Sequence, residues 1–559
     1  MRIAHFVATL AVLGLAACQA KPAPDLILYG GVIHTGVDGA QPVEAVAIRS
    51  GRIMSVGEAS QLVKTGGAQT RLVDLNGAHV YPGFVDSHVH LRGVGERELT
   101  LNLDSVGSIA ELAQTVAEAA DKLSPGAVLI GRGWIETHWP EGRFPTRQDV
   151  DLATGDHPAL LTRADGHALL ANTAALEAMG LLDPVPPDPD GGHIELDAEG
   201  VPTGLLVDNA MSLVASLEGA SPPEEVERAY VTGARRYASL GWTGVHNMAV
   251  APADIETINR LSDAGDLPLR IYNAVDGDSP DAFNVMGGSK AGLVTTRAIK
   301  LFMDGALGSR GALLSAPYAD RPDTAGLQRA RESETRRLLA RAYDSRVQVC
   351  FHAIGDSANH IVLDWMEATF AAVPEAEQKR RDPRWRIEHA QILSPTDIPR
   401  FASLGVIASM QPSHAIGDLY FAPARLGDAR LDGAYAWRSL IDQGAIIAGG
   451  SDAPVEKGDP RIEFYAAVAR KDLQGRSGPD WRPQEAVTRE QALKMFTVWP
   501  AYASFREADL GTIEPGKLAD LTGFSGDLLT VPEAEILTLE PAITVVAGAV
   551  VYDRNAPPF

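Results

Sequence analysis

Eight short apolar runs recur between residues 81 and 452, and helical segments separate most of them. Such alternation is typical of a parallel α/β fold, because each parallel strand must return through a connection outside the sheet. The predicted strands are the run that ends at His90, then TGVHNM, LRIYNAV, AIKLFMDG, VQVCFHAIGD, RIEHAQI, VIASMQPS and AIIAGGSD. Eight strand–helix units predict a (β/α)8 TIM barrel, in which chemistry is carried at the C-terminal ends of the strands.

The chain is long enough to hold further parts. Its 559 residues suggest roughly two to four structural units. The second strand comes late in a barrel domain of residues 81–504, which predicts an inserted α/β subdomain at residues 95–220. Short alternating strands with glycine turns occupy residues 25–80 and 505–556. Because these two pieces are too short to be stable alone, we expect them to pair into one small β-domain.

The first residues are interpreted as a targeting signal, residues 1–18. Arg2 is followed by FVATLAVLGLAA, an apolar run of signal-peptide length that is too short to span a bilayer comfortably. The sequence LAAC resembles the lipobox of bacterial lipoproteins, which implies cleavage before Cys18 and lipidation there. We therefore expect an exported bacterial lipoprotein, periplasmic or on the cell surface; ordinary signal cleavage and an uncleaved start are the alternatives. Cys350 is the only other cysteine, so a lipidated Cys18 leaves no partner for a disulfide.

Composition limits the partners. A formal charge of −23 argues against nucleic acid, because phosphates would be repelled. With 45% hydrophobic and 22% charged residues, the chain has ample material for a core. We expect a small-molecule partner, membrane contact only through the lipid anchor, and no nucleic acid; the sequence leaves a homo-oligomer open.

Polar, metal-competent side chains close five of the predicted strands. His88 and His90 end the first strand, where residues i and i+2 point to the same face. Taken alone, this pair could equally be surface or hydrogen-bonded histidines. Four further strands end in such residues: Lys300, His352, His389 and Asp452. Because all these ends meet at one rim of a barrel, we predict a site for Zn²⁺ or a similar divalent ion.

These segments carry a family resemblance. The matching motifs are PGFVDSHVH, DGHALLANTAAL, IKLFMDGALGSR, HAIGD, RIEHAQ, MQPSH, GSDAPV and GTIEPGKLADL. In this order they resemble the amidohydrolase superfamily, and specifically its family-3 branch, which includes N-substituted formamide deformylases. The resemblance runs from about residue 25 to residue 553. It implies a barrel with a composite β-sandwich built from both termini.

Lys300 requires a separate physical account. A charged ammonium group would be repelled by a divalent ion, but a buried lysine can lose its proton and react with carbon dioxide to form an anionic carbamate. The resemblance implies that carboxylated Lys300 bridges two zinc ions, one held by His88, His90 and Asp452 and the other by His352 and His389. The alternative is an ordinary amine that binds substrate beside a single metal ion.

The leading functional hypothesis is a metal-dependent hydrolase that cleaves the C–N bond of an amide, formamide or N-acyl compound through a metal-activated water. Asp452 is the candidate catalytic base, and three residues are weaker candidates for substrate contacts: His167, Arg310 and His414. Two alternatives are a mononuclear deaminase of a heterocycle and a non-catalytic surface lipoprotein that binds a metal or ligand. We predict that Cys350 is a packed, inert thiol.

Overall fold

The structure, a computed structural model, describes residues 22–164, 166–189, 191–217, 219, 222–478 and 481–556. Eight parallel strands form its central sheet, in the order β7-β14-β15-β17-β18-β19-β20-β21, with the short β16 paired to β17. Their bounds are β7 Phe84–Val89, β14 Trp242–Val250, β15 Arg270–Asp276, β16 Gly287–Gly288, β17 Val294–Phe302, β18 Gln348–Ala353, β19 Arg386–His389, β20 Ile407–Met410 and β21 Ile447–Gly449. The predicted TIM barrel and its eight strands are confirmed.

The barrel closes where the segment after β21 meets β7. The backbone N–H of Asp452 donates to the carbonyl of His88 at 2.6 Å, and that of His90 donates to Ala453 at 2.8 Å. Asp86, buried on β7, also accepts hydrogen bonds from the backbone and hydroxyl of Ser451. The first and last strand ends are therefore held side by side although no ladder joins the two strands.

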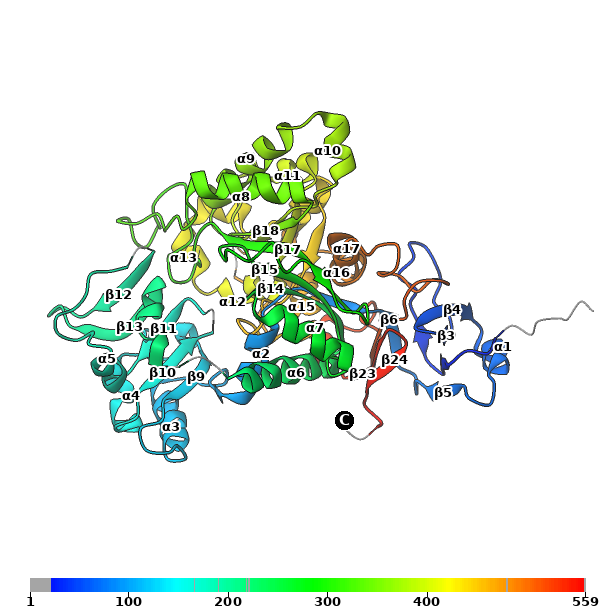
Figure 1. Cartoon of the computed structure of the whole chain (residues 1–559), viewed down its shortest axis with the longest axis horizontal. Helices are drawn as coiled ribbons and strands as arrows, with labels where there is room; N and C mark the ends of the chain where they lie inside the picture. The colour runs from blue at the N-terminus through cyan, green and yellow to red at the C-terminus, as the bar shows by residue number, and fades with distance from the viewer. Residues whose placement is uncertain are drawn as a thin grey trace, which may run out of the picture.

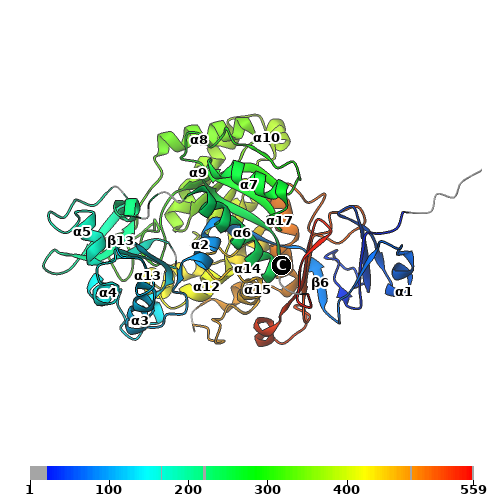
Figure 2. The same cartoon turned by 60° about the horizontal axis from the view of Figure 1, so that its bottom comes forward.

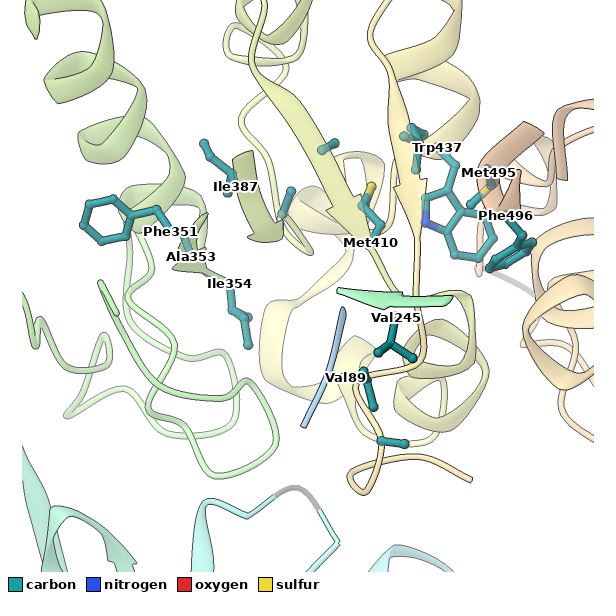
Figure 3. Close-up of a cluster of buried hydrophobic side chains, with 14 of the residues drawn as sticks. Val89, Val245, Phe351, Ala353, Ile354, Ile387, Met410, Trp437, Met495 and Phe496 are labelled. Atoms are coloured by element: carbon teal, nitrogen blue, oxygen red, sulfur yellow. The ribbon is translucent and has the colours of Figure 1, made fainter. Parts of the chain in front are cut away.

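Barrel strands are buried on both faces, which is why they read as continuous apolar runs. All six residues of β18 are buried. A large core cluster joins strand residues to the surrounding helices, and Figure 3 shows Ile387 and Met410 of the strands with Trp437 and Phe496 of the helices.

Helices surround the barrel (Figure 1). Their bounds are α2 Leu91–Leu99, α6 Pro223–Leu240, α7 Asp254–Ala264, α8 Glu332–Ser345, α9 Asp356–Ala371, α10 Glu375–Arg381, α11 Ile398–Leu404, α12 Pro412–Asp418, α13 Ala422–Leu426, α14 Trp437–Asp442, α15 Pro460–Ala469, α16 Arg489–Phe496 and α17 Val498–Ala503. Helix α6 shows how the sequence sets the limits: it begins at Pro223 and ends before Gly241, whose φ of +109° suits only glycine well.

A six-stranded sheet lies between α2 and α6 in the chain, in the order β12-β13-β11-β10-β9-β8. Its strands are β8 Leu101–Asn102, β9 Leu129–Trp134, β10 Ala159–Arg163, β11 Ala168–Ala171, β12 Gly192–Leu196 and β13 Pro202–Asp208, and its helices are α3 Ile109–Ala120, α4 Arg147–Thr154 and α5 Thr173–Ala178. Ser108 caps α3 by accepting from the N–H of Glu111. We call this part the insertion sheet.

Two smaller sheets lie at the opposite end of the barrel from the insertion sheet (Figures 1 and 2). One has the order β4-β3-β1-β5, and the other, β2-β6-β22-β23-β24, joins strands from both ends of the chain. The strands are β1 Leu26–Tyr29, β2 Val32–Ile33, β3 Ala45–Arg49, β4 Arg52–Gly57, β5 Arg71–Asp74, β6 His79–Pro82, β22 Leu521–Phe524, β23 Pro541–Val546 and β24 Ala549–Asp553, with helix α1 Ala59–Leu62. The exact residue limits of the three domains stay predictions.

Among the described residues, no helix is both long and apolar enough to cross a bilayer. The predicted signal segment and Cys18 lie outside the described residues. Cys350 is a free, buried thiol whose pKa is raised by burial, as expected of a packed side chain.

Candidate metal centre

His88 and His90 extend from the end of β7 toward the barrel axis, and each has a defined hydrogen-bond partner. His88 Nδ1 lies 2.6 Å from Glu388 Oε2, and His90 Nδ1 lies 3.2 Å from the carbonyl oxygen of Met248. Because a carboxylate and a carbonyl can only accept, both Nδ1 atoms carry the proton. The Nε2 atom of each imidazole is therefore bare and available as a metal ligand.

Asp452 completes a triangle with these two histidines. Its Oδ1 lies 3.4 Å from His88 Nε2 and 3.3 Å from His90 Nε2, and this buried oxygen has no hydrogen-bond partner. Two ligand atoms of tetrahedral zinc, each about 2.1 Å from the ion, lie about 3.4 Å apart. The spacing thus suits shared coordination. Asp452 is placed by a left-handed backbone, with φ at +59°.

His389 reaches the same point from β19. Its ring centroid lies 4.8 Å from that of His88, and its Nδ1 donates to Gln411 Oε1 at 2.9 Å. Its φ is +74°, a conformation that is uncommon for residues other than glycine. The ligand atoms of His88, His389 and Asp452 all lie within 4.8 Å of one another, and all three residues are buried.

His352 lies on the other side of His389, with 4.5 Å between the ring centroids. Its Nε2 is buried without a hydrogen-bond partner and lies 3.4 Å from Asp304 Oδ1. Asp304 is itself fixed, since it accepts from the backbone N–H groups of Ile354 and Gly355. The ring of His389 therefore lies between the rings of His88 and His352.

Lys300 is fully buried on β17, and its Nζ lies 3.3 Å from His88 Nε2. Burial lowers the pKa of this lysine, which favours the neutral amine. Lys300 Nζ and Asp452 Oδ1 therefore both face the bare Nε2 of His88.

Electrostatics hold these groups in the ionisation states that bind metals. Burial, with Lys300 next, lowers the pKa of His88 to about 4, and burial also lowers the pKa of His352 and His389. Burial alone would raise the pKa of Asp452, but the neighbouring imidazoles, His88 first, hold it well below its usual range. Neutral imidazoles beside an ionised carboxylate are the donor set that a divalent ion requires.

The donor set, its spacing and the unpartnered buried atoms of Asp452 and His352 fit a divalent metal ion. Sequence reasoning missed Glu388 and Gln411, which orient His88 and His389 through Nδ1, and Asp304, which lies 3.4 Å from His352 Nε2. The signal for Glu388 was present, because Arg386 and Glu388 alternate on β19 and pair inside the barrel at 2.8 Å. Arg386 also donates to Nδ1 of His246, so His246 is part of the buried hydrogen-bond network around Arg386.

A cavity of about 920 Å³ opens above the centre. Barrel residues His90, Lys300, His352, His389 and Asp452 line its floor together with residues of the insertion sheet. The cavity is thus enclosed by two parts of the chain that are far apart in sequence.

Two of the three weaker candidates for substrate contacts lie in the cavity, and the third does not. His167 and His414 line the cavity; His167 Nδ1 lies 2.6 Å from Asp208 Oδ1, and His414 Nε2 lies 3.7 Å from Asp452 Oδ2. Arg310 does not line the cavity, and its guanidinium group pairs with Asp320 at 2.9 Å. The structure therefore does not bring Arg310 into the site.

Comparison with known proteins identifies the family. The sequence model of the amidohydrolase family matches residues 71–552. The chain belongs to this family. It is an enzyme, a hydrolase that acts on C–N bonds, and its family relationship together with the buried His/Asp cluster supports a divalent metal.

Individual relatives agree. The chain is 34% identical over 535 residues to YtcJ of Bacillus subtilis, which is named as an amidohydrolase, covering 95% of this chain and 99% of that one. It is 28% identical over 550 residues to an N-substituted formamide deformylase of Arthrobacter pascens, covering 95% and 99%. The fold is similar to that of a metal-dependent hydrolase from Pyrococcus horikoshii, with a TM-score of 0.73, 27% identity and coverage of 91% and 99%.

Proposed function

We propose that this amidohydrolase cleaves the C–N bond of a formamide, amide or N-acyl compound at a centre of two zinc ions. His88, His90 and Asp452 would hold one ion, His352 and His389 the other, and a carbamate on Lys300 would lie between them. The observation that carries the proposal is the position of Asp452, whose unpartnered Oδ1 lies 3.4 Å and 3.3 Å from the bare nitrogens of two histidines.

When bound, divalent ions would polarise the substrate carbonyl and lower the pKa of a water molecule towards neutrality. Asp452 is the base that takes a proton from that water and returns it to the leaving amine. Its carboxylate is suited to the task because the surrounding imidazoles keep it ionised while burial keeps bulk water away.

His167 supplies a second proton-handling group above the centre. Asp208 Oδ1 can only accept, so Nδ1 of His167 donates to it, and this contact fixes the orientation of the imidazole. The ring lies 6.1 Å from that of His352, with the cavity between the insertion sheet and the barrel floor. In this proposal His167, which lines the cavity, contacts the carbonyl or the departing nitrogen of a bound amide.

Lys300 fits the bridging role because burial favours its neutral amine. Attack of this neutral amine on carbon dioxide forms a C–N bond as one C=O π bond opens, and the nitrogen then loses one proton, so the product is an anionic carbamate. Glu388 cannot take this role, since it is paired with Arg386 and His88.

The direct test is a screen of zinc-loaded protein, prepared with bicarbonate, against N-formyl, N-acetyl and longer N-acyl amines. We expect release of the free amine and the corresponding acid. Turnover of an aminated heterocycle with no reaction on any amide would contradict the proposal.

A further inference from the structure

The wall of the cavity beside His414 carries an uncompensated acid. Glu456 follows β21 in a loop, and its side chain is 27% exposed, toward the cavity that it lines. Among the residues that the structure describes, no lysine or arginine nitrogen lies within 4 Å of its carboxylate; the nearest basic atom is His414 Nε2, at 4.0 Å. Glu456 therefore faces the substrate space without a permanent cationic partner.

Neighbouring acids add to this negative potential. Burial, followed by repulsion from Asp418 and Asp452, raises the pKa of Glu456 to about 8. The cationic residues of the lining do not outweigh these acids: Arg163 is held by Glu136 at 2.8 Å, Lys300 belongs to the metal centre, and Lys457 and Arg476 are exposed. Glu456 therefore holds a proton near neutral pH, and a cation entering here would take the place of that proton.

An independent observation comes from the uncharged residues of the same wall. Gln391 is only 4% exposed, and its Nε2 pairs with His414 Nδ1 at 2.9 Å, but its buried Oε1 has no hydrogen-bond partner. Ser413, 2% exposed, likewise has an unpartnered hydroxyl. A buried acceptor without a donor is costly, and a ligand that brings N–H groups would supply the missing donor.

His414 lies between this wall and the metal centre. Its ring contacts Gln391 through Nδ1, while its Nε2 lies 3.7 Å from Asp452 Oδ2 and 4.0 Å from Glu456 Oε1. One imidazole thus separates the metal centre from the acceptor-rich wall. A molecule that reaches both needs only a short spacer.

We propose that the cavity selects amides whose amine portion carries a positively charged nitrogen on a short spacer, with that nitrogen held by Glu456 and Gln391. The proposal rests on the proposed hydrolysis for its reaction, but the cation subsite can be tested without it. Aromatic side chains in the lining, including Trp139 and Phe421, are suited to pack against the spacer.

Equilibrium binding tests the subsite directly. At pH 9, where Glu456 is ionised, n-butylammonium should bind zinc-loaded protein at least about ten-fold more tightly than n-butanol, a matched neutral probe. Glu456→Gln should reduce this preference to less than about three-fold. Glu224→Gln, which removes an exposed acid at the start of α6, should keep the wild-type preference.

Two outcomes would overturn the proposal: equal binding of both probes to the wild type, or an ammonium preference that Glu456→Gln leaves unchanged. The first needs no variant, so it is decisive even where a substitution impairs folding. For the reaction, N-formyl-1,3-diaminopropane and N-formylbutylamine form a matched pair, and kcat/KM should favour the cationic amide in the wild type. Ammonium binding without cleavage of either amide would support the subsite and count against the proposed hydrolysis.

Discussion

At the scale of single residues, two left-handed backbone positions assemble the centre. Along β19, alternation would send Glu388 and His389 to opposite faces, yet Glu388 lies 2.6 Å from His88 and the ring of His389 lies 4.8 Å from the ring of His88. The φ of +74° at His389 turns its side chain back into the barrel, and +59° does the same for Asp452. Such strained residues gather at functional sites.

This explains what the sequence could and could not reveal. The pair His88 and His90 follows from the two-residue period of a strand. Glu388 could have been inferred from its alternation with Arg386 on one strand. The position of His389 depends on a left-handed backbone angle, and the position of Asp304 depends on a loop conformation. Neither conformation is encoded in a residue pattern, so these two positions required the structure.

Asp452→Asn separates proton transfer from metal binding. The amide keeps the shape and one oxygen of the carboxylate but removes the base, so turnover should fall by about 10²–10⁴. Metal content, measured by elemental analysis, should fall far less, because the other predicted ligands remain.

The matched control is His88→Ala, which should lower metal content and activity together, since it deletes a ligand nitrogen. Near wild-type turnover by Asp452→Asn with full metal would assign the base elsewhere, first to His414, which lies 3.7 Å from Asp452.

Glu456 predicts a pH dependence of stability. Its pKa is about 8 in the folded protein and about 4.3 in an unfolded chain, so between these values the folded state retains a proton that the unfolded state releases. The folded state binds more protons there, and its free energy of unfolding falls as the pH rises. The stability of Glu456→Gln relative to the wild type should therefore increase from pH 6 to pH 9.

Urea unfolding at three pH values measures this difference. Glu224→Gln should track the wild type throughout, because its carboxylate is exposed. A constant difference between Glu456→Gln and the wild type over this range would show that Glu456 ionises normally.

At the scale of elements, close packing of α2 on α6 positions the first ligand strand. A Cβ atom on Gly233 would lie 2.5 Å from the carbonyl oxygen of Leu91, and one on Gly95 would lie 1.8 Å from that of Ala229. Because α2 begins directly after His90, any separation of the two helices moves the end of β7 (Figure 1). Helical periodicity could predict both helices, but not this backbone contact.

Gly233→Ala should therefore destabilise the protein. Alanine is favoured over glycine within a helix by about 1 kcal/mol, but overpacking against backbone costs about 1–3 kcal/mol. We expect a net loss of stability in urea unfolding, together with weaker metal retention. Arg235→Ala, an exposed change on the same helix, should be nearly neutral; increased stability of Gly233→Ala would mean that the helices separate at little cost.

At the scale of the whole molecule, the strands at both chain ends form one sheet, and the insertion sheet helps to enclose the cavity at the other end of the barrel. The first arrangement was predictable, because each terminal piece alone is too short to bury a core. The second was not, because it depends on loops such as that carrying His167, whose direction follows from tertiary packing.

Export and lipid attachment are proposed from the amino-acid sequence alone. Cys18→Ser should release the protein from the membrane fraction or block its processing, whereas Cys350→Ala should leave it there, because that thiol is buried in the barrel. Fractionation of wild-type cells decides the matter: a protein found in the cytoplasm would contradict the lipobox interpretation.

Metal binding should stabilise the whole barrel, because the proposed ligands lie at the ends of five of its eight strands. Protein purified without chelator should contain close to two divalent ions per chain by elemental analysis. Since a ligand that binds only the folded state at a hundred times its Kd stabilises it by about 2.7 kcal/mol, chelation should lower the Tm, and added zinc with bicarbonate should restore it. In Lys300→Ala the metal content should fall to about one ion, and a short-chain carboxylic acid that replaces the carbamate should partly restore the second. A wild-type content that stays near one ion after zinc and bicarbonate would exclude the two-metal centre, leaving Lys300 as an amine beside a single ion.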